Sequence, residues 1–129
     1  MTSPTLARVE VHVFRAPVKE PVRTSFGTMT ERVAVFVRAE DSDGARGWGE
    51  IWSNFPTASA EHRARLLVDI VAPLALGKPL DNPVALWSEL DRALHVLRVQ
   101  SGDAGALSAA AAGLDLAIHD LRARKRGLP

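Results

Sequence analysis

Residues 32–52, RVAVFVRAEDSDGARGWGEIW, decide the fold of this 129-residue chain. Residues 32–40 alternate valines with other side chains, which predicts a strand with the valines facing the core. Residues 41–44, Asp-Ser-Asp-Gly, are typical of a turn because Asp and Gly tolerate the backbone angles that turns require. Residues 45–52 predict a further short strand. The stretch is therefore expected to form an antiparallel hairpin.

Residues 6–15, upstream of this hairpin, predict one more strand. Val9, Val11 and Val13 alternate with other side chains, so the three valines share one face. We expect this strand to extend the hairpin into a three-stranded antiparallel meander.

Segments with helical spacing follow the strands. The first is expected to be capped by Thr57 or Ser59 and to end before Pro73. An Asn-Pro pair at 82–83 predicts a second helix start, and residues 106–126 predict a long final helix. Strands followed by helices indicate an α+β fold: a three-stranded antiparallel meander sheet followed by a bundle of three to four helices.

The composition argues against several classes of function. Hydrophobic residues make up 47% of the chain and charged residues 24%, as in ordinary soluble domains. A net charge of +1 argues against a nucleic-acid partner, and without a long apolar run no membrane span is expected. The absence of cysteine excludes disulfides and thiolate metal sites. With no secretory signal at the start, we expect a cytoplasmic protein.

Motifs for chemistry are absent from the sequence. It contains no glycine-rich nucleotide fingerprint, no HExxH and no GxSxG. Asp115 and Asp120 can reach His119, Arg122 or Arg124 on the final helix, and we interpret them as structural ion pairs. We therefore expect neither a catalytic residue nor a metal site in this chain.

The connection at residues 16–31 is much longer than a hairpin loop of about 2–5 residues. Pro17 and Pro21 stiffen it, and Phe26 and Met29 place apolar side chains on it. Long ordered loops are often binding loops or lids. The alternative is that Phe26 and Met29 fold back onto the core of the domain, and the segment alone does not decide between the two.

Residues 52–56, Trp-Ser-Asn-Phe-Pro, form the second unusual connection. Two aromatic residues flank two small polar ones, a combination suited to a ligand pocket. The alternative is that Phe55 anchors the start of the following helix as a hydrophobic staple.

Four stretches, taken together and in this order, resemble the amino-terminal domain of the mandelate racemase and muconate lactonizing branch of the enolase superfamily. They are PVRTSFGT at 21–28, GARGWGE at 44–50, VAPLALGK at 71–78, and AGLDLAIHDL at 112–121, which continues to GLP at 127–129. The second matches the family pattern G-x-x-G-x-G-E. His119 and Ala123 depart from the family, which often has Trp and Gly at these positions.

The resemblance implies a division of labour between two domains. In such enzymes a TIM barrel of the same polypeptide holds Mg²⁺, and barrel residues abstract the proton alpha to the carboxylate of a small substrate. The amino-terminal domain, here residues 1–129, covers the barrel mouth and shapes specificity. The implied parent is a dehydratase, racemase or cycloisomerase and a homo-oligomer. The chain alone, without the barrel and its magnesium, is predicted to be inactive.

The family's two loops map onto residues 22–32 and 51–57. The substrate-binding residues that this implies are Thr24, Ser25, Phe26 and Thr28 in the first loop, and Trp52, Asn54 and Phe55 in the second. The alternative is a stand-alone binding or oligomerisation module that keeps the fold and lacks catalysis.

Overall fold

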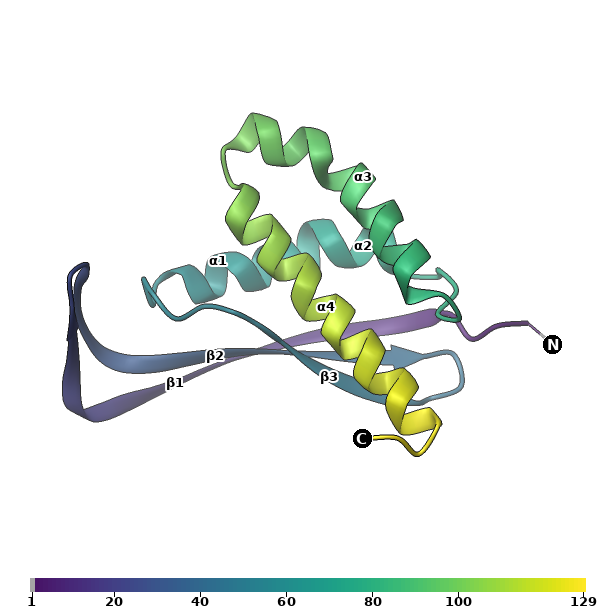
Figure 1. Cartoon of the computed structure of the whole chain (residues 1–129), viewed down its shortest axis with the longest axis horizontal. Helices are drawn as coiled ribbons and strands as arrows, with labels where there is room; N and C mark the ends of the chain where they lie inside the picture. The colour runs from purple at the N-terminus through teal and green to yellow at the C-terminus, as the bar shows by residue number, and fades with distance from the viewer. Residues whose placement is uncertain (1) are drawn as a thin grey trace.

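The computed structural model of the protein describes residues 2–129. Three strands, β1 (Leu6–Thr24), β2 (Gly27–Asp41) and β3 (Arg46–Ile51), pair in that order, and both pairs are antiparallel. The helical elements lie on one face of the sheet (Figure 1). They are α1 (Ser59–Leu66), the π-helical turn η1 (Leu67–Val71), α2 (Ala72–Ala75), α3 (Pro83–Ser101) and α4 (Ala104–Lys125). The predicted α+β fold with a meander sheet is confirmed.

The core lies between the sheet and the helices, with α4 at its centre. Val35 and Val37 of β2 are fully buried, which confirms the inward face predicted for this strand. The apolar side of α4 is buried as well, through Leu107, Ala110, Ala111, Leu114, Ile118 and Leu121. Among residues 2–129, none of the helices combines the length and the apolar character that a membrane span requires.

The backbones of β3 and α4 approach each other very closely. A Cβ atom on Gly47 would lie 2.2 Å from the carbonyl oxygen of Ala117, and one on Gly49 would lie 2.2 Å from that of Gly113. A Cβ atom on Gly113 would lie 2.5 Å from Cγ1 of Ile51. Since these distances are far below van der Waals contact, only glycine fits. The Gly-x-Gly pair of β3 therefore serves helix–sheet packing.

The first helical segment differs from the prediction at both ends. Neither Thr57 nor Ser59 caps α1, since the residue before it is Ala58, which makes no side-chain cap bond. Pro73 does not end the helical path either: η1 inserts a wider turn, and the proline enters the first turn of α2, where its missing N–H is tolerated. Asn82 does cap α3 through its side-chain oxygen, as predicted.

The prediction of a long loop at residues 16–31 is wrong, because β1 and β2 continue through it. Their pairing extends to Thr24 and Gly27, so only residues 25–26 form the turn. A register shift lies between Pro17 and Val22. Proline cannot donate a hydrogen bond to a neighbouring strand, and the irregularity lies where the prolines occur.

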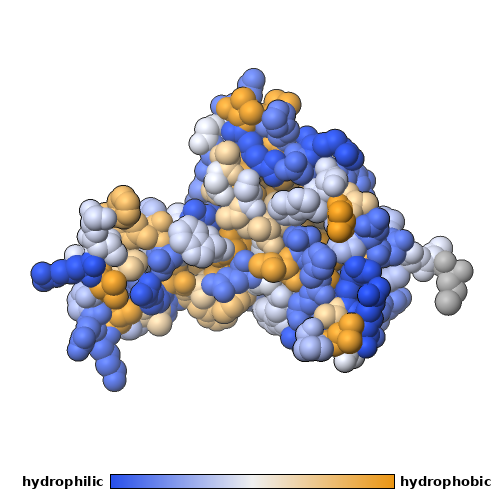
Figure 2. Space-filling model, viewed as in Figure 1, coloured by the Kyte–Doolittle hydropathy of each residue, from blue (hydrophilic) through white to orange (hydrophobic). Residues whose placement is uncertain are grey.

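β3 is much shorter than its neighbours, and its pairing with β2 extends only to Val35 and Ile51. Beyond that point β1 and β2 run on as a two-stranded ribbon, residues 16–32, which we call the arm. The arm projects past the helices (Figure 1), and in the space-filling view it stands out from the body with hydrophobic patches among hydrophilic ones (Figure 2).

Candidate functional site

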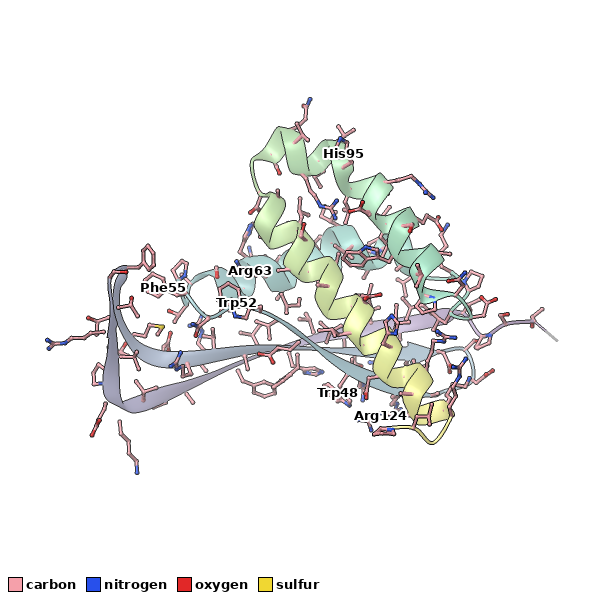
Figure 3. The ribbon with its side chains drawn as sticks, viewed as in Figure 1. Trp48, Trp52, Phe55, Arg63, His95 and Arg124 are labelled. Atoms are coloured by element: carbon pink, nitrogen blue, oxygen red, sulfur yellow. The ribbon has the colours of Figure 1, made fainter. Side chains whose placement is uncertain are left out.

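The two segments singled out in the sequence lie together at one end of the sheet. They are the tip of the arm, residues 24–28, and the β3–α1 loop, residues 52–58. A Cβ atom on Gly27 would lie 3.4 Å from Cζ of Phe55, so the Phe55 ring packs against the tip. Gly27 has a φ of +144°, a backbone conformation that favours glycine. Figure 3 shows Phe55 beside the arm, with Trp52 nearby.

The predicted residues at the tip are all exposed. Phe26 is 83% exposed, an unusual position for a large apolar side chain. The Thr24 hydroxyl accepts a hydrogen bond from the Phe26 N–H (3.2 Å) and donates to a carbonyl across the turn (3.0 Å). Ser25 and Thr28 face solvent. Met29 is only 4% exposed, so it folds back onto the domain whereas Phe26 does not.

The β3–α1 loop presents one aromatic residue outward and packs the other. Trp52 is 63% exposed, and the guanidinium carbon of Arg63 lies 6.0 Å from its ring centroid. Asn54 is exposed, and its Oδ1 accepts a hydrogen bond from Arg32 Nη1 at 2.7 Å. Phe55 is half-buried, in contact with the tip. The loop and the arm are therefore joined by both polar and apolar contacts.

Ser53 holds the β3–α1 loop from inside. It is 4% exposed, and its hydroxyl lies 3.2 Å from that of Ser59. Arg63 Nη1 donates to Ser59 and, at 3.4 Å, to Ser53. This group was not predicted from the sequence, although the spacing of four residues between Ser59 and Arg63 on a helix is a signal for it.

Arg15 connects the base of the arm to the loop and to α1. Its Nε and Nη2 donate to the Glu61 carboxylate at 3.0 and 2.6 Å, and Nη2 also donates to the Thr57 carbonyl at 3.0 Å. Nη1 donates to Glu31 on β2. Hydrogen bonding from Arg15 lowers the pKa of Glu61. Arg15 was not predicted from the sequence, because its partners on the loop and α1 are 42 and 46 residues away in the chain.

The two aspartates of α4 lie beside the partners predicted from the sequence, and Asp120 forms an ion pair with Arg124. Burial opposes ionisation of Asp120, but bonds from the Trp48 N–H (2.8 Å) and Arg124 Nε (2.7 Å) outweigh it and lower its pKa. Asp115 lies 3.7 Å from His119. Burial raises the pKa of Asp115, and the nearby His119 offsets this only in part.

The tip and the β3–α1 loop together form a surface that we call the rim. Phe26 and Trp52 offer apolar contacts, while the exposed hydroxyl and amide groups beside them can hydrogen-bond to a ligand. Arg32 and Arg63 add positive charge, which favours an anionic ligand. In residues 2–129, no group of three or more His, Asp or Glu side chains could hold a metal ion. The apolar, hydrogen-bonding and cationic groups of the rim suit it to binding a ligand.

Two clear hollows of the surface lie away from the rim. One of about 290 Å³ is lined by residues that include Asp41, Leu80 and Lys125. Another, of about 490 Å³, is lined by residues that include Trp48 and Leu116. Neither contains a residue of the tip or the loop. At the rim, Phe26 and Trp52 are largely exposed, so a second surface would be needed to bury a ligand held between them.

Comparisons of the sequence with known proteins agree on one protein family. Residues 8–129 match the sequence model described as mandelate racemase / muconate lactonizing enzyme, N-terminal domain. The o-succinylbenzoate synthase of Geobacillus stearothermophilus is 31% identical over 118 residues, which covers 87% of this chain and 28% of that protein.

Solved structures share the fold. A mandelate racemase/muconate lactonizing enzyme from Bordetella bronchiseptica is 46% identical with a TM-score of 0.84, over 98% of this chain and 32% of that one. A racemase from Streptomyces coelicolor with bound magnesium superposes with a TM-score of 0.80 at 24% identity, over 94% of this chain and 32% of that one. The chain thus spans about a third of the length of these proteins.

Proposed function

Because the chain belongs to the mandelate racemase/muconate lactonizing enzyme family, as its N-terminal domain, we propose that it is the substrate-capping and specificity domain of a longer enzyme. In this proposal a TIM barrel of the same polypeptide abstracts the proton alpha to the carboxylate of a small substrate. Magnesium, which is bound in the Streptomyces coelicolor structure, would be held by that barrel. The observation that supports the proposal is the open rim, at which Phe26 and Trp52 are exposed despite their apolar side chains.

The rim residues would have different tasks. Phe26 and Trp52 would cover the apolar part of the substrate and exclude water. Ser25, Thr28 and Asn54 would hydrogen-bond to the end of the substrate that is remote from the reacting carbon. Thr24 and Phe55 would shape the rim: Thr24 bonds within the turn, and Phe55 packs against it.

Kinetics on the full-length protein test this proposal. We would screen it with acid sugars, N-acylamino acids and muconates in the presence of Mg²⁺ and then compare the Phe26→Ala and Trp52→Ala variants. We expect kcat/KM for the preferred compound to fall by about 10–100-fold and the order of preference to change, because a capping surface acts through placement of the substrate.

The matched control is Val96→Ala on α3, which also truncates an exposed apolar side chain (66% exposed). It should leave the kinetics unchanged. Phe26→Ala and Trp52→Ala variants that behave like this control would overturn the capping proposal. Residues 1–129 in isolation are expected to show no magnesium-dependent turnover of the same compounds.

The open face of the sheet favours a second candidate, a stand-alone binding or oligomerisation module that lacks catalysis. His12, Phe14, Phe36 and Trp48 form a band there, with ring centroids 5.8 Å apart for Phe14–Phe36 and 5.9 Å apart for His12–Trp48. Phe14 is 56% exposed and Trp48 is 42% exposed, and exposed apolar patches promote association. Size-exclusion chromatography tests this: a clean monomer at high concentration would count against it. Homo-oligomer formation and a cytoplasmic location stay predictions.

A further inference from the structure

Arg15 contacts three other parts of the domain at the base of the arm. It lies just before the register shift that follows Pro17, and its guanidinium bonds Glu31 on β2, the carbonyl of Thr57 in the β3–α1 loop, and Glu61 on α1. Both Nε and Nη2 reach the Glu61 carboxylate. This two-pronged contact uses the planar fork of arginine, which lysine cannot reproduce.

Two further contacts join the arm to the same loop, one at the base and one at the tip. Arg32 Nη1 donates to Asn54 Oδ1 at 2.7 Å, and the Phe55 ring packs against Gly27. The arm is thus attached to the loop at its base, through Arg15 and Arg32, and at its tip, through Gly27. Movement of one segment away from the other would therefore break these contacts.

The Arg15 network is partly exposed, with side-chain exposures of 31% for Arg15, 35% for Glu31 and 51% for Glu61. Ion pairs this accessible to water contribute little to global stability. Their geometric effect is larger, because they fix the direction in which a two-stranded ribbon leaves the sheet. The network therefore acts mainly on the placement of the rim.

We infer that Arg15 is a positioning residue that makes the arm and the β3–α1 loop move as a single lid, with Phe26 and Trp52 held at a fixed relative placement. This inference rests on the proposed capping function and deepens it. The arm and the β3–α1 loop would act as one rigid unit instead of two independent loops. The residue that sets the geometry of this lid lies at the base of the arm, where it contacts the backbone of the β3–α1 loop at Thr57 and none of the exposed aromatic side chains.

Hydrogen–deuterium exchange on the chain tests the coupling without any substrate. In Arg15→Gln we expect amides of both the arm and the β3–α1 loop to exchange about tenfold faster, as for loss of a hydrogen bond to a charged group. Arg15→Lys should speed exchange similarly: lysine keeps the positive charge, but it cannot make the two-pronged contact with Glu61. The matched control is Arg46→Gln, since Arg46 pairs with Glu40 at 2.8 Å on the same sheet but outside the arm. Unchanged exchange, or faster exchange in the arm alone, would overturn the inference.

A double-mutant cycle in the full-length protein separates positioning from simple stabilisation. Arg15→Gln should raise KM, because the tip is no longer held in place. Adding Phe26→Ala to Arg15→Gln should then raise KM by a smaller factor than adding Phe26→Ala to Arg46→Gln. Fully additive effects would overturn the positioning role and leave the capping proposal intact. A silent Phe26→Ala in the unmodified protein would instead overturn the capping proposal, while the exchange experiment still decides on Arg15.

Discussion

Lys125 Nζ lies 2.8 Å from Asp41 Oδ2, although 84 residues separate the two in the chain. The Asp41 side chain is completely buried, and its other oxygen accepts hydrogen bonds from the N–H groups of Asp43 (3.0 Å) and Ala45 (2.9 Å). One carboxylate therefore holds the β2–β3 turn in shape and fastens the last turn of α4 to it.

Substitution of the two aspartates that bind Lys125 should have unequal effects. Asp41→Asn keeps an acceptor for the turn but leaves Lys125 without its buried partner, and we expect a loss on the order of 2 kcal/mol. Asp43 also lies 2.8 Å from Lys125 but is 63% exposed, so Asp43→Asn should cost less than about 1 kcal/mol. Urea unfolding of the isolated chain measures both, and equal losses would contradict the importance of burial at Asp41.

Stability at low pH should depend on the same carboxylate. Burial opposes ionisation of Asp41, but the bonds from Lys125 and the turn N–H groups outweigh it and lower its pKa below 3.8. A lowered folded-state pKa adds stability that is present above the unfolded pKa and lost as the pH falls through the folded one. Melting temperatures measured below about pH 4 should therefore fall more steeply for the wild type than for Asp41→Asn. If the melting temperatures of the two proteins fell in parallel with pH, the lowered pKa of Asp41 would not contribute to stability.

The glycines of β3 should tolerate no substitution. In Gly47→Ala the new methyl group would meet backbone atoms of α4, which cannot move aside, so we expect a loss of about 3 kcal/mol or more. At Gly105, in the first turn of α4, a Cβ atom would have no neighbouring atom within 4 Å, and Gly105→Ala should instead add less than about 1 kcal/mol. Thermal unfolding of the two variants should thus shift in opposite directions, and a neutral Gly47→Ala would disprove the close approach.

Removal of the charge at Asp115 should stabilise the domain at neutral pH. Burial raises the pKa of this carboxyl, so its ionised form is disfavoured in the fold. The stability associated with its protonated form is complete below the unfolded pKa and lost as the pH rises through the folded one. Asp115→Asn should therefore raise the melting temperature at pH 7 by an amount equivalent to less than about 1 kcal/mol, and the gain should vanish in acid. A gain that persists in acid would point to another cause.

Local patterns predicted the fold well where each one was reinforced by packing. The valines of β2 face the core, the Asn-Pro pair starts α3, and the predicted apolar side of α4 is buried. The exit from α1 was not predictable in the same way. Pro73 is a helix breaker in the usual α-helical register, but the wider turn of η1 changes that register just before it.

The candidate site was only partly predictable. The tip and the loop stood out by composition and do lie together, yet the strands through the arm were obscured by Pro17 and Pro21. The arginines that connect the two segments were missed because their partners are distant in sequence. Such long-range pairs follow from the path of the chain in three dimensions, which no local pattern of residues encodes.

The arm is a part of this domain whose length can change without altering the packing of the core. Its strands extend beyond β3, whereas the core is built around β2, β3 and α4. Residues can be added or removed in pairs near the turn at 25–26, one on each strand, without shifting the register at the base. The reach of the ribbon is thus adjustable in steps of one strand pair, and under the proposed capping function new substrate preferences would arise there while the packed interior of the domain stays untouched.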